Sequence, residues 1–359
     1  EHQAVGKRAG GLTMQNQGRE RMEYGMKTGK QRSRGRPGAF IIHYCAFIIG
    51  CAIAVNAAMA QPYPTKPIRL LLGYAPGGPT DLTGRLVGQH LNEGLGQPVV
   101  MDNRAGAGGS LAAALLANAE PDGYTLLLAA NGEIAIAPNL RRKLPYHPLK
   151  DLAPISRVGT SQLVLVVHPS VPAKSTADLI ALAKAKAGGV NFASAGTGST
   201  AHLAGEYFKH LAAIDIVHVP YKGAGPALTD LMGGQVQMLI TGYSAASAHV
   251  KAGKLRALAV TGAKRLSAAP DLPTLGETVK GYEVTSWYGF LAPVRTPQAV
   301  IARLHKEIAA VVKRPEVIKR LIALGIEPEG NTPREFREQI KKEIATWSKV
   351  VKLAKVEVE

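Results

Sequence analysis

Two glycine-rich segments contain the residue types that can bind an anion without a charged side chain. They are Tyr74-Ala75-Pro76-Gly77-Gly78-Pro79-Thr80-Asp81 and Ser194-Ala195-Gly196-Thr197-Gly198-Ser199-Thr200. Each joins an apolar, strand-like run to a helical pattern. Glycines let the backbone approach a ligand closely, and the first N–H groups of a helix lack intrahelical partners. We predict that the two loops face each other across a cleft; the alternative is that both are ordinary strand-to-helix turns.

Side chains beside these glycines add hydrogen-bonding groups. Hydroxyls of the two loops are expected to donate to an anion, and Tyr74 either walls the pocket or packs inside. Ionised Asp81 repels a carboxylate, so its expected role is to bond backbone amides on the first helical turn. Asn131 follows a strand and is a further candidate. The residues predicted to form the ligand site are Tyr74, Pro76, Gly77, Gly78, Pro79, Thr80, Asp81, Asn131, Ser194, Gly196, Thr197, Gly198, Ser199 and His202.

Catalytic and metal-binding patterns are weak in comparison. Ser199 and His202 are close in sequence, but no Gly-x-Ser-x-Gly elbow occurs, and a serine at a helix start is more simply a cap. The histidines show no metal-ligand spacing, and no phosphate-binding loop with Gly-Lys-Ser/Thr is present. We therefore predict no catalytic residue, no metal and no cofactor. A secreted serine hydrolase using Ser199 and His202 remains an alternative.

The first 60 residues have the features of an export leader. Basic residues precede an almost wholly apolar run over residues 39–55, and Ala58-Met59-Ala60 forms a small-x-small cleavage site. We expect a signal peptide cleaved after Ala60, with Met22 or Met26 as its start, and hence a periplasmic protein. The alternative is a lipoprotein anchored through Cys51, since Ile48-Ile49-Gly50-Cys51 is similar to a lipobox.

Composition excludes several other classes. Both cysteines, Cys45 and Cys51, lie in the leader, which excludes disulfides and cysteine-ligated metals from the remaining chain. The formal net charge is +17, but Lys and Arg are scattered and aromatic residues make up only 5% of the chain. This pattern disfavours nucleic-acid binding. We expect a soluble monomer.

The order of the predicted elements indicates an α/β fold with mainly parallel strands. Strand patterns occur at residues 68–73, 98–101, 124–129, 163–167, 190–193, 214–219 and 255–261, and amphipathic helices complete the chain. We place one crossing between two lobes near residue 163 and a return crossing near residue 285. The expected division is residues 1–60 as leader, 61–163 with 286–359 as the first lobe, and 164–285 as the second. The architecture is that of a hinge-closing, two-lobed binding protein.

The chain resembles the Bug-type solute-binding proteins of bacterial tripartite tricarboxylate transporters. The resemblance covers nearly all of the chain after the leader and rests on the shared order of several motifs. These are the two glycine-rich segments, Asn103-Arg104, Pro121-Asp122-Gly123-Tyr124, Leu144-Pro145-Tyr146, Val219-Pro220-Tyr221-Lys222-Gly223, Gly253-Lys254-Leu255-Arg256 and Pro270-Asp271-Leu272-Pro273.

The resemblance implies a periplasmic fold of the Venus-flytrap type, similar to type II binding proteins, in which a carboxylate binds between the lobes. It also implies delivery of that carboxylate to membrane permease subunits. The expected ligand is a di- or tricarboxylate, an acidic amino acid or an aromatic carboxylate. The alternative function without a permease is an orphan receptor that reports its ligand to a two-component sensor.

Overall fold

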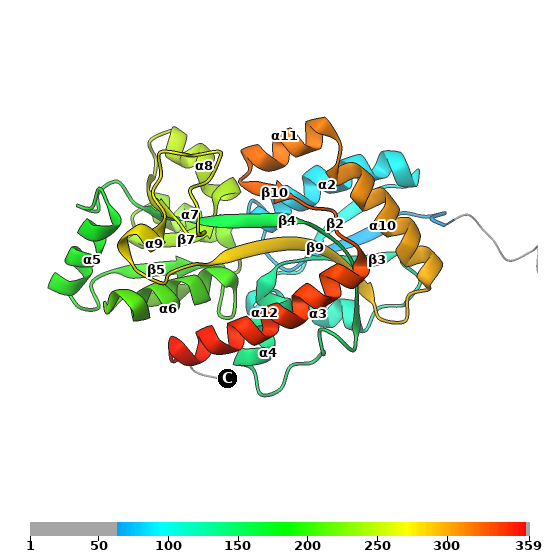
Figure 1. Cartoon of the computed structure of the whole chain (residues 1–359), viewed down its shortest axis with the longest axis horizontal. Coiled ribbons are helices and arrows are strands. Elements are labelled where there is room, and N and C mark those ends of the chain that lie inside the picture. Colours follow the sequence, from blue (N-terminus) through cyan, green and yellow to red (C-terminus); the bar gives the residue numbers. More distant parts are fainter. Residues whose placement is uncertain (1–62, 357–359) are drawn as a thin grey trace, which may run out of the picture. The chain divides into compact units, whose positions relative to one another are not determined.

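The computed structural model describes residues 63–356, and the predicted leader and its cleavage site lie outside these residues (Figure 1). Ten strands form one mixed sheet with the order β2-β1-β3-β9-β4-β7-β5-β6, and β8 and β10 also pair with β4. The strands are β1 (Ile68–Leu72), β2 (Val99–Asn103), β3 (Thr125–Ala129), β4 (Leu152–Val167), β5 (Asn191–Ser194), β6 (Val217–Pro220), β7 (Met238–Gly242), β8 (Arg256–Val260), β9 (Thr285–Pro293) and β10 (Ile326–Pro328).

Strand β4 connects two parts of this sheet. Residues 152–162 of β4 pair with β9, and residues 163–167 pair with β7 and β8. We call β1, β2, β3, β9 and β10 the A half, and β5, β6, β7 and β8 the B half. Figure 1 shows β4 and β9 running side by side between the helices of the two halves. The predicted crossing points, near residues 163 and 285, fall in these two strands, and the division into lobes stays a prediction.

The α/β class is confirmed, but the expectation of mainly parallel pairing is wrong at the centre of the sheet. Five of the nine strand pairings are antiparallel, and all five involve β4 or β9. Only the outer pairings are parallel. The sequence pattern of β4 is misleading because buried polar residues interrupt its first part: the Ser156 hydroxyl donates to Asn331 O, and Arg157 pairs with Glu329 at 2.6 Å.

Helices cover both faces of the two halves. Sequence periodicity missed α8 and α11, because α8 is rich in alanine and serine and α11 is short and follows directly on the preceding helix. The helices are α2 (Pro79–Leu95), α3 (Ser110–Ala117), α4 (Ala137–Leu140), α5 (Thr176–Ala185), α6 (Thr200–Ala212), α7 (Ala224–Met232), α8 (Tyr243–Lys251), α9 (Leu275–Thr278), α10 (Gln298–Val312), α11 (Pro315–Ala323) and α12 (Pro333–Leu353), with a 3-10 turn at Ala107–Gly109 and a π-helix, η2, at Gly132–Ile136. Within residues 63–356, none of these helices has the length and apolar character needed to cross a bilayer.

The C-terminal helix α12 packs on the cores of both halves. Phe336 and Ile340, in its first part, lie in the apolar cluster of the A half with Trp287. Trp347 and Val351, in its second part, lie in the cluster of the B half. The Phe336 and Trp287 rings meet edge to face at 5.0 Å. The sequence predicted that the C-terminus returns to the first lobe; the structure adds its contact with the other half.

We expect Gly205→Ala to destabilise the fold. Gly205 lies on α6, and a methyl group there would overlap the fully buried ring of Phe192 on β5. Overpacking costs about 1–3 kcal/mol, which exceeds the gain of about 1 kcal/mol from replacing a helical glycine. Urea unfolding of the two proteins measures the difference.

Gly233→Ala is the matched control, because Gly233 has an ordinary φ of −80° and no atom closer than 3.5 Å to the added methyl group. Equal losses of stability in both variants would contradict the packing argument.

Candidate functional site

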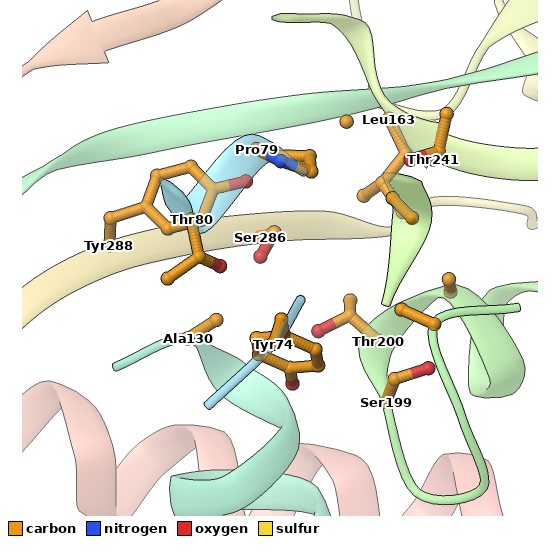
Figure 2. A pocket seen from close by; sticks show the side chains of 14 residues that line it. Tyr74, Pro79, Thr80, Ala130, Leu163, Ser199, Thr200, Thr241, Ser286 and Tyr288 are labelled. Carbon is orange, nitrogen blue, oxygen red and sulfur yellow. The ribbon is translucent and has the colours of Figure 1, made fainter. Parts of the chain in front are cut away.

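A small cavity lies between the A and B halves, and its lining is uncharged. Its volume, counted as the space open to the centres of water molecules, is about 50 Å³, which suits a small molecule. Seven of the residues that contact it carry hydroxyl groups, and most of the others are small (Figure 2). The lining residues are Tyr74, Pro79, Thr80, Ala130, Leu163, Ala195, Ser199, Thr200, Ala201, Ala224, Thr241, Gly242, Ser286 and Tyr288.

Four helix N-termini meet at this cavity. Helix α2 contributes Pro79 and Thr80, α6 contributes its first residues, α7 contributes Ala224, and α8 contributes its N-cap Gly242. The N-caps of α2, α7 and α8 are glycines, so no side chain occupies the first N–H groups of these helices. Each N-terminus carries roughly half a positive charge. The arrangement therefore creates a positive potential although no Lys or Arg lines the cavity.

Only part of the first predicted loop lines the cavity. Tyr74, Pro79 and Thr80 line the cavity, whereas Pro76, Gly77 and Gly78 do not. Pro76 and Gly77 are exposed to solvent, and Gly78 is buried as the N-cap of α2.

Asp81 does not line the cavity and instead organises this loop. Its carboxylate accepts hydrogen bonds from Gly77 N at 3.1 Å, from Arg85 Nε at 2.9 Å and from Asn103 Nδ2 at 3.2 Å. Burial opposes its charge, but these donors together lower the pKa of Asp81 below its usual value. Asn103 Nδ2 also donates to Tyr74 O at 2.9 Å. Asp81 thus bonds one backbone amide, that of Gly77 before the helix, and its other donors are side chains.

In the second predicted loop, only Ser199 lines the cavity among the predicted residues. Its Oγ accepts from His202 N at 3.2 Å and so caps α6. Gly196, Thr197 and Gly198 form the turn below it, away from the cavity lining. The neighbours Ala195, Thr200 and Ala201 complete the lining on this side.

Ser194 and His202 lie behind the loop and support it. Ser194 Oγ lies 2.6 Å from His218 Nε2 and accepts from Gly196 N at 3.0 Å. His202 Nδ1 accepts from Gly198 N at 3.2 Å, and its ring stacks on His218 with centroids 4.1 Å apart. Burial lowers the pKa of His202 to about 3, with His218 adding to the effect, and burial lowers the pKa of His218 to about 4. Both rings are therefore neutral at physiological pH.

These contacts do not form the Ser199 and His202 pair that a hydrolase would need. Ser199 Oγ bonds the backbone N–H of His202, while the His202 ring nitrogen bonds Gly198 N. The Ser194 and His218 pair, which sequence spacing did not suggest, does not line the cavity. Within residues 63–356 no group of three His, Cys, Asp or Glu side chains is arranged to hold a metal ion.

Asn131 lies behind the cavity and acts on one of its lining residues. Its Nδ2 donates to Glu343 Oε2 at 2.7 Å, and its Oδ1 accepts from Ser286 Oγ and from Trp287 N, both at 2.9 Å. Ser286 lines the cavity, whereas Asn131 does not. Asn131 therefore links α12 to the cavity through β9.

Several lining residues on strands, or directly after them, were not predicted from the sequence. They come from four strands or their ends: β3, β4, β7 and β9. Nothing local marks these positions, since the cavity forms only when the two halves of the sheet meet. Thr200, at the start of α6, also lines the cavity, and the sequence predicted its hydroxyl as a donor. The missed residues of the strands are Ala130, Leu163, Thr241, Gly242, Ser286 and Tyr288.

The buried carboxyl group of Glu133 is hydrogen-bonded to two residues that line the cavity. The Tyr74 hydroxyl lies 2.8 Å from Gly108 O and 2.9 Å from Glu133 Oε2, while Glu133 Oε1 accepts from Ala130 N at 2.9 Å. Tyr74 has one proton for two acceptors. Both contacts are satisfied when Glu133 is protonated and donates to Tyr74, which then donates to Gly108. Burial raises the pKa of Glu133 to about 7, in agreement with this arrangement.

Backbone contacts close the cavity between the two halves. Ala75 N donates to Lys222 O at 3.0 Å. Gly108 packs so closely on the second loop that a methyl group added to it would lie 2.5 Å from Thr197 O. Gly108 also has φ +62°. Glycine is required at this position both by its conformation and by the close approach of the two loops.

The sequence matches a known receptor family over most of the described chain. The model of the tripartite tricarboxylate transporter family receptor matches residues 83–356. The chain belongs to this family. It is 38% identical over 314 residues to the protein BugT of Bordetella pertussis, which covers 85% of this chain and 95% of BugT. The predicted family resemblance is confirmed, and membership identifies the protein as a solute-binding receptor and not an enzyme.

Solved structures similar to this receptor share its fold. One described as a periplasmic transporter is 40% identical with a TM-score of 0.81, covering 83% of this chain and all of its own. Rpa4515 of R. palustris, solved with adipate, is 36% identical with a TM-score of 0.80, covering 82% and 98%. MatC of Rhodopseudomonas palustris, solved with bound malate, is 31% identical with a TM-score of 0.77, covering 80% and 100%. The two-lobed binding-protein fold is thereby confirmed.

We expect Glu133→Gln to remove one part of the pH dependence of the receptor's unfolding free energy. The folded-state pKa of about 7 lies above the usual value of 4.5, so this stabilisation is complete below pH 4.5 and is lost as the pH rises through 7. The loss is about 3 kcal/mol. Glutamine reproduces the hydrogen bonds of the protonated acid and does not titrate.

The measurement is the difference in unfolding free energy between the two proteins at pH 4.5 and at pH 8. His202 and His218 titrate in both proteins, so their opposite contribution cancels in this difference. Parallel stability curves for the two proteins would show that Glu133 is ionised throughout.

Proposed function

We propose that this receptor is a periplasmic protein that captures a small carboxylate between its two lobes and delivers it to a transporter of the tripartite tricarboxylate type. It acts as a monomer. The observation that carries the proposal is the meeting of four helix N-termini at a cavity with no charged lining side chain. Such a site attracts anions and offers no partner for a cation.

The energetic requirement for such binding is modest. A micromolar dissociation constant corresponds to about 8 kcal/mol. Hydrogen bonds from backbone N–H groups to a carboxylate are charge-assisted, and each contributes about 1.5–3 kcal/mol. Several such bonds, supplemented by hydroxyl donors such as Ser199 and Thr200, account for this affinity without a salt bridge.

Binding and release require the two halves to separate, because most of the lining residues are buried and backbone contacts join the two halves beside the cavity. We place the hinge in β4 and β9, the two strands that connect the halves. The pairing of β4 with β9 changes register at residues 154–156 and 157–159. These irregular points interrupt the regular ladder. The proposed lobes are residues 61–163 with 286–359, and residues 164–285, with α12 contacting both.

The ligand class is inferred from the chemistry of the cavity and from the relatives. Adipate and malate, bound by two proteins of similar structure, are both small dicarboxylates. The family description supports transfer of the ligand to a membrane transporter. The leader, outside the described residues, supports export to the periplasm. A small dicarboxylate is therefore the first ligand class to test.

A thermal-shift screen tests the proposal. A ligand that binds only the folded state raises the melting temperature by mass action. We expect saturable shifts with small di- or tricarboxylates and none with neutral analogues such as the corresponding diamides. The protein should first be unfolded, dialysed and refolded so that any ligand acquired during expression is removed. Shifts with diamides equal to those with the acids would exclude an anion site.

We expect Gly78→Asp to reduce carboxylate affinity at least 100-fold while the fold is retained. Gly78 is the N-cap of α2 with φ −85° and ψ 173°, a conformation that any residue adopts and that aspartate favours as a cap. Its carboxylate would occupy the N-terminus of α2 and repel the ligand. Isothermal titration calorimetry measures the change.

Gly78→Asn separates charge from shape, because asparagine has the same size and also caps helices but carries no charge. A similar affinity loss in both variants would mean that bulk, and not charge, prevents binding. Unchanged affinity in the aspartate variant would show that the ligand does not use this helix terminus.

A further inference from the structure

The Ser286 hydroxyl is a polar group of the cavity whose proton is bound by another side chain. Ser286 is the second residue of the return strand β9, is buried, and lies between Thr80, Tyr74 and Thr200 in the close-up view (Figure 2). Its Oγ donates to Asn131 Oδ1 at 2.9 Å. Whether this donation is obligatory depends on the orientation of the Asn131 amide.

The Asn131 amide has one allowed orientation. Its oxygen faces the backbone N–H of Trp287 at 2.9 Å, and this N–H can only donate. Its nitrogen faces Glu343 Oε2 at 2.7 Å, which also accepts from Trp287 Nε1 at 2.7 Å. Turning the amide over would place two donors against each other at Trp287 and two acceptors against each other at Glu343. The oxygen of Asn131 therefore faces Ser286.

This orientation determines what Ser286 can offer a ligand. A hydroxyl has one proton and two lone pairs, and the proton of Ser286 is used by Asn131, which cannot donate from its oxygen. Only lone pairs remain for the cavity. Ser199 has the opposite polarity, because its Oγ accepts from His202 N and keeps its proton for a ligand. The cavity thus combines donors suited to carboxylates with one acceptor that a carboxylate would not satisfy.

A hydroxyl group on the ligand fits this acceptor better than an ammonium group. No Asp or Glu lines the cavity, and four helix N-termini give it a positive potential that opposes a buried cation. The acids near the cavity already have partners within the protein. Asp81 of the first loop is bonded to Gly77, Arg85 and Asn103. Glu133 is bonded to the lining residues Tyr74 and Ala130. A neutral hydroxyl can donate to Ser286 without such a penalty.

We propose that the receptor selects hydroxycarboxylates, with Ser286 accepting the hydrogen bond from the ligand's hydroxyl group and Asn131 acting as the positioning residue that enforces this role. This inference rests on the proposed function, since it concerns the rest of a ligand whose carboxylates the helix N-termini bind. A ligand without the hydroxyl leaves a buried acceptor without a partner, and this raises its dissociation constant.

The test compares malate with succinate, which differ by one hydroxyl group, by calorimetry on the purified, refolded protein. Each enantiomer of malate is titrated separately. We expect the enantiomer with the higher affinity to bind at least tenfold more tightly than succinate. Aspartate, with an ammonium in place of the hydroxyl, should bind more weakly than that malate. In Ser286→Ala the preference for malate over succinate should fall below threefold, because malate loses its acceptor and succinate no longer leaves that acceptor without a partner.

Ser199→Ala is the matched control, because it removes a hydroxyl from the same cavity that serves the carboxylates of both ligands. It should weaken malate and succinate by similar factors and keep their ratio. A malate preference that persists in Ser286→Ala, equal binding of malate and succinate to the unaltered protein, or tighter binding of aspartate would each overturn the selectivity proposal while leaving carboxylate binding established. Binding of no carboxylate at all would instead overturn the proposed function, and this inference with it.

Discussion

The proposed anion site is buried and has no charged partner, and this is the constraint on which the structure depends. Helix N-termini act on an anion only over short distances, and water weakens their effect. The N-termini must therefore converge and the site must close. The fold meets both needs by placing four strand-to-helix connections at one junction, two of them at Thr80 and Thr200. Close backbone approach then follows, and it explains why Gly108 can carry no side chain where it meets Thr197.

The same junction is tied to the strands that connect the two halves. Strand β9 carries Ser286 in the cavity and Trp287 in the core behind it. The Trp287 indole and Asn131 both bond Glu343 on α12, a helix that packs on both halves. A movement of one half relative to the other must therefore be accommodated close to the residues that contact the ligand. Recognition and closure share one hydrogen-bonded network.

Sequence reasoning could predict the backbone part of the site but little of its side-chain part. Glycines between a strand pattern and a helix pattern are local signals, so both loops and the capping role of Ser199 were accessible. The positions of Ser286 and Thr241 depend on the pairing of strands distant in sequence, which no local pattern encodes. Asn131 and His202 were predicted as ligand-site residues, yet neither lines the cavity, and their side chains contact Glu343 and His218, which are neighbours that only the folded chain defines.

Glu133 shows why a carboxyl group can lie beside an anion site. If ionised, it would oppose the ligand and leave Tyr74 with one proton for two acceptors. If protonated, it completes a directed chain of hydrogen bonds from Glu133 through Tyr74 to Gly108. That chain holds the loop that packs on Thr197, so the acid stabilises the closed contact in its neutral form. A bound anion raises the pKa of a neighbouring carboxyl group further, and thus favours the protonation state that keeps the cavity closed.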